Sequence, residues 1–267
     1  MKPALLLTAL VLVVTIAAGL PARAATLCTL VADARSGVIR HQSGTCDEPV
    51  TPASTFKIAL AVLGFEAGIL TADDAPVMTI RPGEPDWGGP AWHRPVDPRA
   101  WMTHSVVWYS QRIAASLGAQ RLEAGARRLG YGNADFAGDP GKDNGLQRAW
   151  ISSSLLISPR EQVAFLAALA TDALPVDRAS MALARSIVET NAAGGWTLHG
   201  KTGSAYPRRA DGSLDRARGW GWYVGWAERD GQLLTFARLA QDERRESVSG
   251  GLRARESLIV DWVGLVR

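Results

Sequence analysis

The stretch Pro52-Ala53-Ser54-Thr55-Phe56-Lys57-Ile58-Ala59-Leu60 places a serine and a lysine three positions apart at the start of an apolar helix. Side chains at positions i and i+3 share a helix face, so the hydroxyl and the amine are neighbours. Ser54 falls in the first turn, where unpaired backbone N–H groups and the helix dipole favour developing negative charge. The apolar neighbours of Lys57 predict a dry pocket, which lowers the pKa of the amine. A serine beside a neutral amine is an activated nucleophile, although the spacing alone also fits a solvated helix.

Lysine usage points to the same motif. The chain has four lysines and 25 arginines. Arginine keeps its charge at any accessible pH, whereas a buried lysine can lose its proton and act as a base. Lys2 lies in the N-terminal leader and Lys142 in a turn-rich segment. The other two, Lys57 and Lys201, both lie in motifs typical of serine acyl transfer.

The second motif is Lys201-Thr202-Gly203, in a stretch that the pattern predicts to be a strand. A glycine in a strand allows a substrate backbone to approach closely. A lysine and a hydroxyl at a strand edge suit a carboxylate ligand. Taken alone, the motif also fits the polar end of an ordinary strand.

The first 24 residues predict a cleaved export signal. Lys2 precedes an apolar run of 17 residues, Ala4 to Leu20, and Pro21-Ala22-Arg23-Ala24 follows as a small-residue cleavage site. A membrane anchor is the alternative, because a run of this length is borderline for spanning a bilayer. We expect residues 25–267 to form a secreted mature protein without a stable membrane anchor.

The charge of the chain argues against polyanionic partners. The net charge is +3, and removal of Lys2 and Arg23 with the leader leaves about +1, too little to attract nucleic acid or an anionic membrane. The only cysteines are Cys28 and Cys46. In an exported chain such a pair favours a disulfide bond, with two free thiols as the alternative.

Hydrophobic periodicity predicts strands at both ends of the chain around a helical middle. We expect strands at 27–32, 38–41, 196–202, 220–228 and 233–240, and helices at 54–64, 105–118, 119–130, 158–171, 178–191 and 251–266. This order indicates an α+β fold, with one antiparallel sheet packed by helices and joined to a helical lobe. The sheet lobe would comprise about 25–50 and 194–267, and the helical lobe about 51–193, with the active-site cleft between them.

Further motifs follow in a recognisable order. After Ser54-x-x-Lys57 come Ser105-Val106-Val107, Tyr131-Gly132-Asn133, Trp150 and Lys201-Thr202-Gly203. The order of the S-x-x-K, serine and K-T-G motifs is the signature of serine β-lactamases and penicillin-binding transpeptidases. With its S-x-V, Y-G-N and W marks, the mature chain resembles the class D, oxacillinase-type β-lactamases.

The resemblance implies hydrolysis of the β-lactam ring of penicillins and cephalosporins, which gives antibiotic resistance. Ser54 would be the acylated nucleophile. Lys57 would react with CO2 to form a carbamate, which would act as general base for acylation and deacylation. Trp150 would hydrogen-bond this carbamate, and Val107 would keep its pocket apolar.

The resemblance also assigns residues that move protons and bind the substrate. Ser105 and Lys201 would pass protons to the leaving β-lactam nitrogen. Thr202 and Arg253 would hold the substrate carboxylate, the arginine through its donor fork. Arg255 lies two positions further on and is the alternative.

The backbone N–H groups of Ser54 and Ser204 would form an oxyanion hole, each contributing roughly 3 kcal/mol in the transition state, and Gly203 would also contact the substrate. Ser204 departs from the bulky residue common after K-T-G in the family, which leaves the substrate range open. Tyr131 and Asn133 would support the site without reacting. No metal and no dissociable cofactor are implied, only CO2 or bicarbonate. The partners would be a β-lactam and water, the assembly a monomer or homodimer, and the location the bacterial periplasm.

Other functional classes fit the sequence less well. The four histidines accompany neither a G-x-S-x-G nor an H-x-H-x-D motif, which argues against a Ser-His-Asp hydrolase and a metallo-β-lactamase. Packing explains five of the ten tryptophans better than carbohydrate binding does, because they lie in core-like strand or helix positions: Trp196, Trp220, Trp222, Trp226 and Trp262. Trp87 and Trp92 either border the cleft or pack at the surface. A D,D-transpeptidase with S-x-N and a β-lactam sensor behind transmembrane helices would share the nucleophile, and both remain alternatives.

Overall fold

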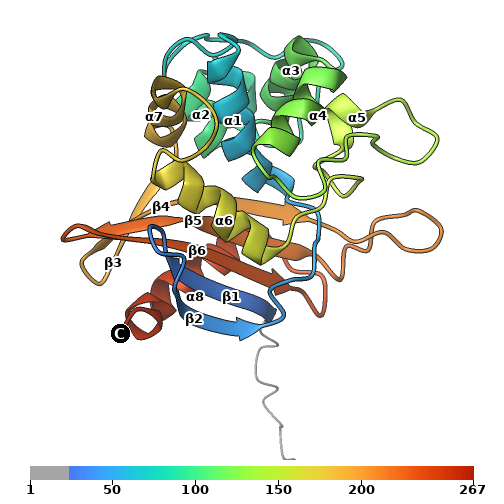
Figure 1. Ribbon diagram of the computed structural model, residues 1–267. Coiled ribbons are helices and arrows are strands. Elements are labelled where there is room, and N and C mark those ends of the chain that lie inside the picture. Colours follow the sequence, from blue (N-terminus) through green and yellow to red (C-terminus); the bar gives the residue numbers. More distant parts are fainter. Residues whose placement is uncertain (1–23) are drawn as a thin grey trace, which may run out of the picture.

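The computed structural model describes residues 24–267, so the expected leader lies outside the described residues except for Ala24. Its centre is an antiparallel sheet with the strand order β2-β1-β6-β5-β4-β3 (Figure 1). The strands are β1 (Ala25–Asp33), β2 (Ile39–Gly44), β3 (Thr190–Ala193), β4 (Trp196–Ala205), β5 (Trp220–Arg229) and β6 (Gln232–Gln241). The two ends of the chain thus build one sheet, as the sequence predicts.

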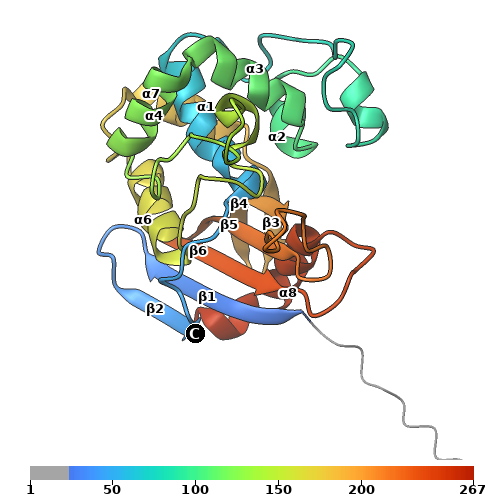
Figure 2. The same cartoon turned by 90° about the vertical axis from the view of Figure 1, so that its right-hand side faces the viewer.

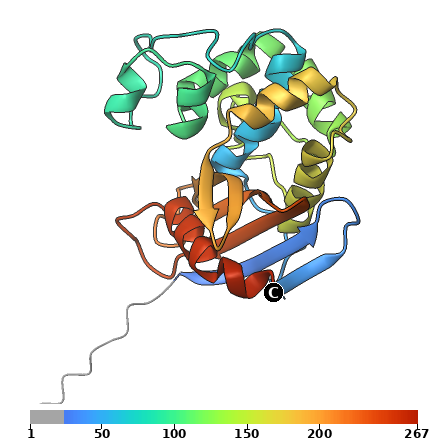
Figure 3. The same cartoon turned by 90° about the vertical axis from the view of Figure 1, so that its left-hand side faces the viewer.

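Helices cover both faces of this sheet. The helices of the described residues, including those of the helical lobe, are η1 (Ala53–Thr55), α1 (Phe56–Glu66), η2 (Pro90–His93), α2 (Pro98–Thr103), α3 (Val107–Leu117), α4 (Ala119–Arg128), α5 (Gly145–Arg148), α6 (Pro159–Ala170), α7 (Arg178–Ser186) and α8 (Gly250–Leu265). Helix α6 lies across β1 and β6 on the side of the helical lobe (Figure 2). Helix α8 crosses the opposite face, against β4 and β5 (Figure 3). None of the helices within residues 24–267 is both long and apolar enough to cross a membrane.

The sheet separates two hydrophobic cores, and alternation along β5 shows how. Trp222, Val224 and Trp226 belong to the larger core on the side of the helical lobe, whereas Tyr223 and Ala227 belong to the core beneath α8. Successive strand residues face opposite sides of a sheet. Lys201 in β4 pairs with Val224, so its side chain enters the face toward the helical lobe. This register places the lysine of the K-T-G motif at the junction of sheet and helices.

A disulfide bond joins the buried Cys28 and Cys46, which confirms the predicted pairing. The bond links β1 to the segment that follows β2 and leads to the nucleophile. It therefore ties β1, which lies between β2 and β6, to the segment that leads into the helical lobe.

The α+β fold is confirmed, but the segment before β4 differs from its prediction. The expected helix 178–191 ends as α7 at Ser186, and Thr190–Ala193 forms β3. Gly194 and Gly195 both have positive φ and form the turn of the β3–β4 hairpin. Such a glycine pair marks the end of a helix and the turn of a hairpin equally well. The sheet lobe accordingly begins again at Thr190, not at residue 194.

Candidate active site

The serine and the lysine of the first motif are neighbours at the start of the central helix. Ala53, with a φ of 52°, turns the chain into the short helix η1, and α1 continues from it. The amine of Lys57 lies 3.4 Å from the hydroxyl of Ser54. Ser54 is half-buried, whereas Lys57 is only 1% exposed. The nucleophile candidate is therefore open to a ligand, and the amine behind it is sealed from water.

Burial lowers the pKa of Lys57 well below its ordinary value, and the nearby charge of Lys201 lowers it further. Burial also lowers the pKa of Lys201 to about 8; the carboxylate of Glu189 opposes this shift and Arg255 adds to it. Two cations in one dry site disfavour each other, so the charged form is costly for both. A neutral Lys57 is the form that can act as a base.

Lys201 reaches from the sheet to the helical lobe. Its amine donates to the hydroxyl of Ser105 over 2.6 Å and to the carbonyl of Thr202 over 3.2 Å. Ser105 has a φ of 54° and lies before α3, which begins at Val107, whereas the predicted helix 105–118 began at Ser105 itself. The indole of Trp92 donates to the carbonyl of His104 and so fixes the backbone before Ser105. Trp92 therefore packs beneath the site, while Trp87 is 65% exposed.

Val107 and Trp150 both belong to the large hydrophobic core, which also includes Phe56 and Ile58 on either side of Lys57. Val107 begins α3 and is buried, and Trp150 lies in the loop between α5 and α6, where its ring packs 5.4 Å from that of Phe56. Trp150 is 1% exposed, and no hydrogen bond joins its indole N–H to a protein acceptor within residues 24–267. In the described part of the chain, the fully buried side-chain atoms that lack a partner belong to Ser153, Trp196 and Trp262, so the N–H of Trp150 is not sealed in the core and is free to donate to a ligand.

Glycine at position 203 is a steric requirement. A Cβ there would lie 2.7 Å from the carbonyl oxygen of Pro52, which precedes the nucleophile. The backbone of β4 thus passes directly beside the segment that carries Ser54. Ser204 accepts a hydrogen bond from the backbone N–H of Gly251 at the start of α8, and Thr202 is half-buried beside the same helix.

Tyr131 and Asn133 hold neighbouring segments together. The buried Tyr131 hydroxyl accepts from Gln162, whose amide also donates to Thr55. Burial raises the pKa of Tyr131, which keeps the phenol neutral. The side chain of Asn133 donates to the carbonyl of Ser154 and accepts from the backbone N–H of Leu156. It therefore stabilises the loop that follows Trp150.

The two arginines of α8 have different environments. Residues two positions apart on a helix differ by about 200° in direction, so Arg253 and Arg255 face opposite sides. The guanidinium of Arg253 pairs with Asp242 over 2.5 Å and donates to the carbonyl of Val248. Arg255 is half-buried, and its charge acts on Lys201. Arg253, the arginine expected from the sequence, is thus paired with Asp242, whereas the charge of its neighbour Arg255 acts on Lys201.

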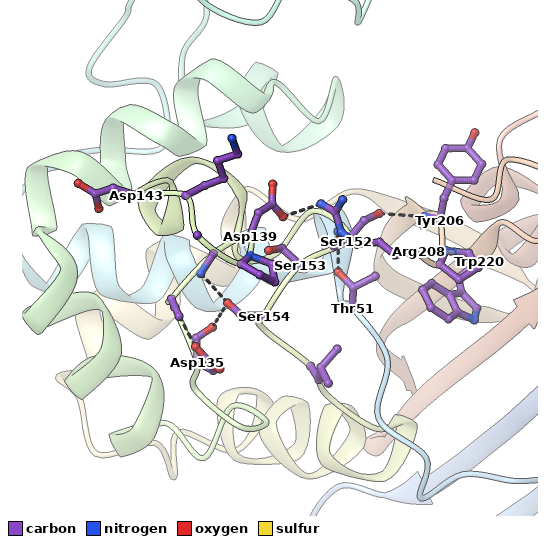
Figure 4. A pocket seen from close by; sticks show the side chains of 17 residues that line it. Thr51, Asp135, Asp139, Asp143, Ser152, Ser153, Ser154, Tyr206, Arg208 and Trp220 are labelled. Atoms are coloured by element: carbon purple, nitrogen blue, oxygen red, sulfur yellow. Dashed lines mark hydrogen bonds and ion pairs between the residues drawn. The ribbon is translucent and has the colours of Figure 1, made fainter. Parts of the chain in front are cut away.

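A pocket of about 830 Å³ lies beside the loop that follows Trp150 (Figure 4). Thr51, Ser152, Tyr206 and Arg208 are among its lining residues, while Ser54 and Lys57 are outside it. Within residues 24–267, no group of three His, Cys, Asp or Glu side chains has an arrangement suited to a metal ion.

Known proteins share this sequence and fold. The family model of the penicillin-binding protein transpeptidase domain matches residues 25–260. The β-lactamase OXA-9 of Klebsiella pneumoniae is 39% identical over 88% of this chain and 86% of its own length. The β-lactamase OXA-1 of Escherichia coli is 29% identical over 87% of this chain and 82% of its own length.

Solved structures agree with the sequence matches. The crystal structure of the OXA-427 class D β-lactamase has a TM-score of 0.82 and 42% identity, covering 89% of this chain and 97% of that one. The C-terminal domain of the BlaR penicillin receptor of Bacillus licheniformis has a TM-score of 0.75 at 22% identity, covering 90% of each chain, and shows the fold alone. The chain therefore belongs to the penicillin-binding protein transpeptidase family and, within it, to the class D β-lactamases.

Proposed function

We propose that this chain hydrolyses the β-lactam ring of penicillin- and cephalosporin-type antibiotics through an acyl-enzyme on Ser54. The observation that carries the proposal is the 3.4 Å contact between the Ser54 hydroxyl and an amine that is buried at 1% exposure. Burial favours the neutral amine, which can take the proton of the serine. The membership in the class D β-lactamases supplies the substrate class.

The geometry supports two half-reactions. In acylation the Oγ of Ser54 attacks the lactam carbonyl carbon and its proton moves to the side chain of Lys57. The C–N bond breaks, and the leaving nitrogen takes a proton along the 2.6 Å contact between Lys201 and Ser105. Before deacylation the proton on Lys57 passes to Lys201, which has given its own to the leaving nitrogen. A water molecule then loses a proton to the side chain of Lys57 and attacks the ester. The ring-opened acid leaves, and Ser54 regains its proton.

The residues around Lys57 fit a carbamate formed with CO2. Only a neutral amine adds CO2, and burial lowers the pKa of this amine. The free indole N–H of Trp150 would hold a carbamate oxygen, and Val107 keeps the site apolar. When bound, CO2 supplies a carboxylate base at Lys57 for both half-reactions. Apart from this CO2, we propose that the reaction needs no dissociable cofactor.

Arg255, in place of Arg253, is the proposed partner of the substrate carboxylate, together with Thr202. Its charge acts on Lys201, whereas Arg253 is paired with Asp242. The backbone N–H groups of Ser54 and Ser204 are proposed to hold the oxyanion, since the contact of Gly203 with Pro52 brings the two segments together. From the leader we also propose secretion to the periplasm, as a monomer or homodimer.

The test is hydrolysis of a chromogenic cephalosporin by the protein, with and without added bicarbonate, followed by absorbance and by mass spectrometry. Sustained turnover that bicarbonate increases at mildly acid pH is the expected result. Ser54→Ala should show neither turnover nor an acyl adduct. A single stoichiometric burst with a stable adduct would contradict the proposal and identify a transpeptidase or a β-lactam sensor.

A further inference from the structure

The hydroxyl of Thr51 joins the segment that precedes the nucleophile to the loop that contains Trp150. Thr51 lies three residues before the nucleophile and is 1% exposed. Its Oγ1 donates to the carbonyl of Trp150 over 3.0 Å and accepts from the backbone N–H of Ser152 over 3.1 Å. One side chain therefore satisfies backbone groups on both sides of Ile151, in the loop that carries the indole of Trp150.

Thr51 itself is held by the sheet. The indole N–H of Trp222, a fully buried residue of β5, donates to the carbonyl of Thr51 over 2.9 Å. Thr51 is therefore hydrogen-bonded both to β5 and to the loop that contains Trp150, so it holds this loop in a fixed position relative to the sheet.

The backbone conformation of Ser152 indicates that contacts with other segments hold the loop that contains Trp150 in place. Its φ of 55° belongs to the left-handed region, which costs a serine free energy unless the surroundings enforce it. The hydroxyl of Ser152 accepts from the backbone N–H of Tyr206, and its carbonyl accepts from Arg208 (Figure 4). Arg208 is in turn paired with Asp139 over 2.5 Å. Contacts from the nucleophile segment and from the end of β4 thus converge on one loop.

We propose that Thr51 is a positioning residue for Trp150, and that its hydroxyl keeps the indole N–H directed at a carbamate on Lys57. This inference rests on the proposed function, because it assigns the N–H of Trp150 to that carbamate. The N–H has no protein acceptor within the described residues, so its orientation depends on packing and on the backbone that Thr51 holds.

The decisive variant is Thr51→Val, which keeps the shape of the side chain and removes both hydrogen bonds. Thr51→Ser restores the hydroxyl and is the rescue control. Thr235→Val is the matched control for a buried hydroxyl, since Thr235 donates to the carbonyl of Ala32 within the sheet. Should Thr51→Val fail to fold, Thr51→Ala is measured in the same way.

The measurement is carbamate occupancy, from the ¹³C NMR signal of protein titrated with ¹³C-bicarbonate, alongside thermal unfolding. We expect Thr51→Val to need about tenfold more bicarbonate for half occupancy, because a tenfold change corresponds to the free energy of about one buried hydrogen bond. Thr51→Ser and Thr235→Val should stay within about twofold of wild type. Wild-type occupancy in Thr51→Val, with only its melting temperature lowered, would overturn the inference alone. A wild-type protein that turns over without any carbamate signal would overturn the proposed carbamate and the inference together.

Discussion

The amine of Lys201 donates a 2.6 Å hydrogen bond to the hydroxyl of Ser105, although 96 positions separate the two residues. Lys201 comes from β4 and Ser105 from the turn before α3, so this contact bridges the sheet and the helical lobe. Its length is typical of a charge-assisted or strongly polarised hydrogen bond, along which a proton can pass. This contact is the path that we propose for protonation of the leaving nitrogen.

Replacing Ser105 by alanine should interrupt this path. We expect kcat/KM for a chromogenic cephalosporin to fall about 10²- to 10³-fold, the usual contribution of a positioned proton donor. Ser116→Ala removes an exposed hydroxyl from the end of α3 and should leave kcat/KM unchanged. Activity of Ser105→Ala within about twofold of wild type would assign protonation of the nitrogen to another group.

The lowered pKa of Lys201 predicts a pH-dependent cost in stability. Its amine titrates at about 8 in the folded protein and near 10.5 when unfolded. Between these values the unfolded chain holds a proton that the folded chain lacks, so the unfolding free energy rises with pH. Below about pH 8 the cost is fully present, at about 3 kcal/mol.

Lys201→Met removes this titration. Relative to wild type, the variant should gain most at and below pH 8, and the gain should vanish as the pH approaches 10.5. Urea unfolding at several pH values gives the difference directly, with the exposed Lys142→Met as control for the loss of a lysine. A difference that stays constant from pH 8 to 10.5 would mean that Lys201 keeps an ordinary pKa.

The disulfide bond should contribute stability without taking part in the chemistry. It closes a loop of 18 residues between Cys28 and Cys46, which corresponds to about 3 kcal/mol in the chain-entropy model. The double variant Cys28→Ala/Cys46→Ala should lose about this much unfolding free energy in urea and retain kcat. Reduction of the wild type should reproduce the loss, and a simultaneous fall in kcat would show that the bond also shapes the site.

Much of the fold could be predicted because the decisive signals are local. The three-residue spacing of Ser54 and Lys57 brings their side chains to one face of a helix. The continuous apolar runs of β5 and β6, which are buried on both faces of the sheet, indicate strands. The position of Ser105 was harder to predict, because its positive φ is imposed by the contacts around it. Thr51 belongs to no motif, and only the packed structure reveals that its hydroxyl serves a loop 99 positions away.

Helix α8 illustrates why a sequence motif does not predict the direction in which a side chain points. The sequence shows two arginines near the helix start, and either could follow the K-T-G strand. The buried Ala254, Leu258 and Trp262 set which side of α8 meets the sheet. This rotation places Arg253 against Asp242 and leaves the charge of Arg255 to act on Lys201.

Replacing each of the two arginines by alanine tests how α8 is rotated about its axis. Arg255→Ala should raise KM for a penicillin about tenfold or more, because the substrate carboxylate loses a charged partner. Arg253→Ala removes the partner of the buried Asp242. It should lower the melting temperature and change KM little, since an unpaired buried carboxylate destabilises the fold. Steady-state kinetics and thermal unfolding of both variants separate the two effects. If Arg253→Ala raised KM and Arg255→Ala did not, the carboxylate would bind on the Arg253 side of α8.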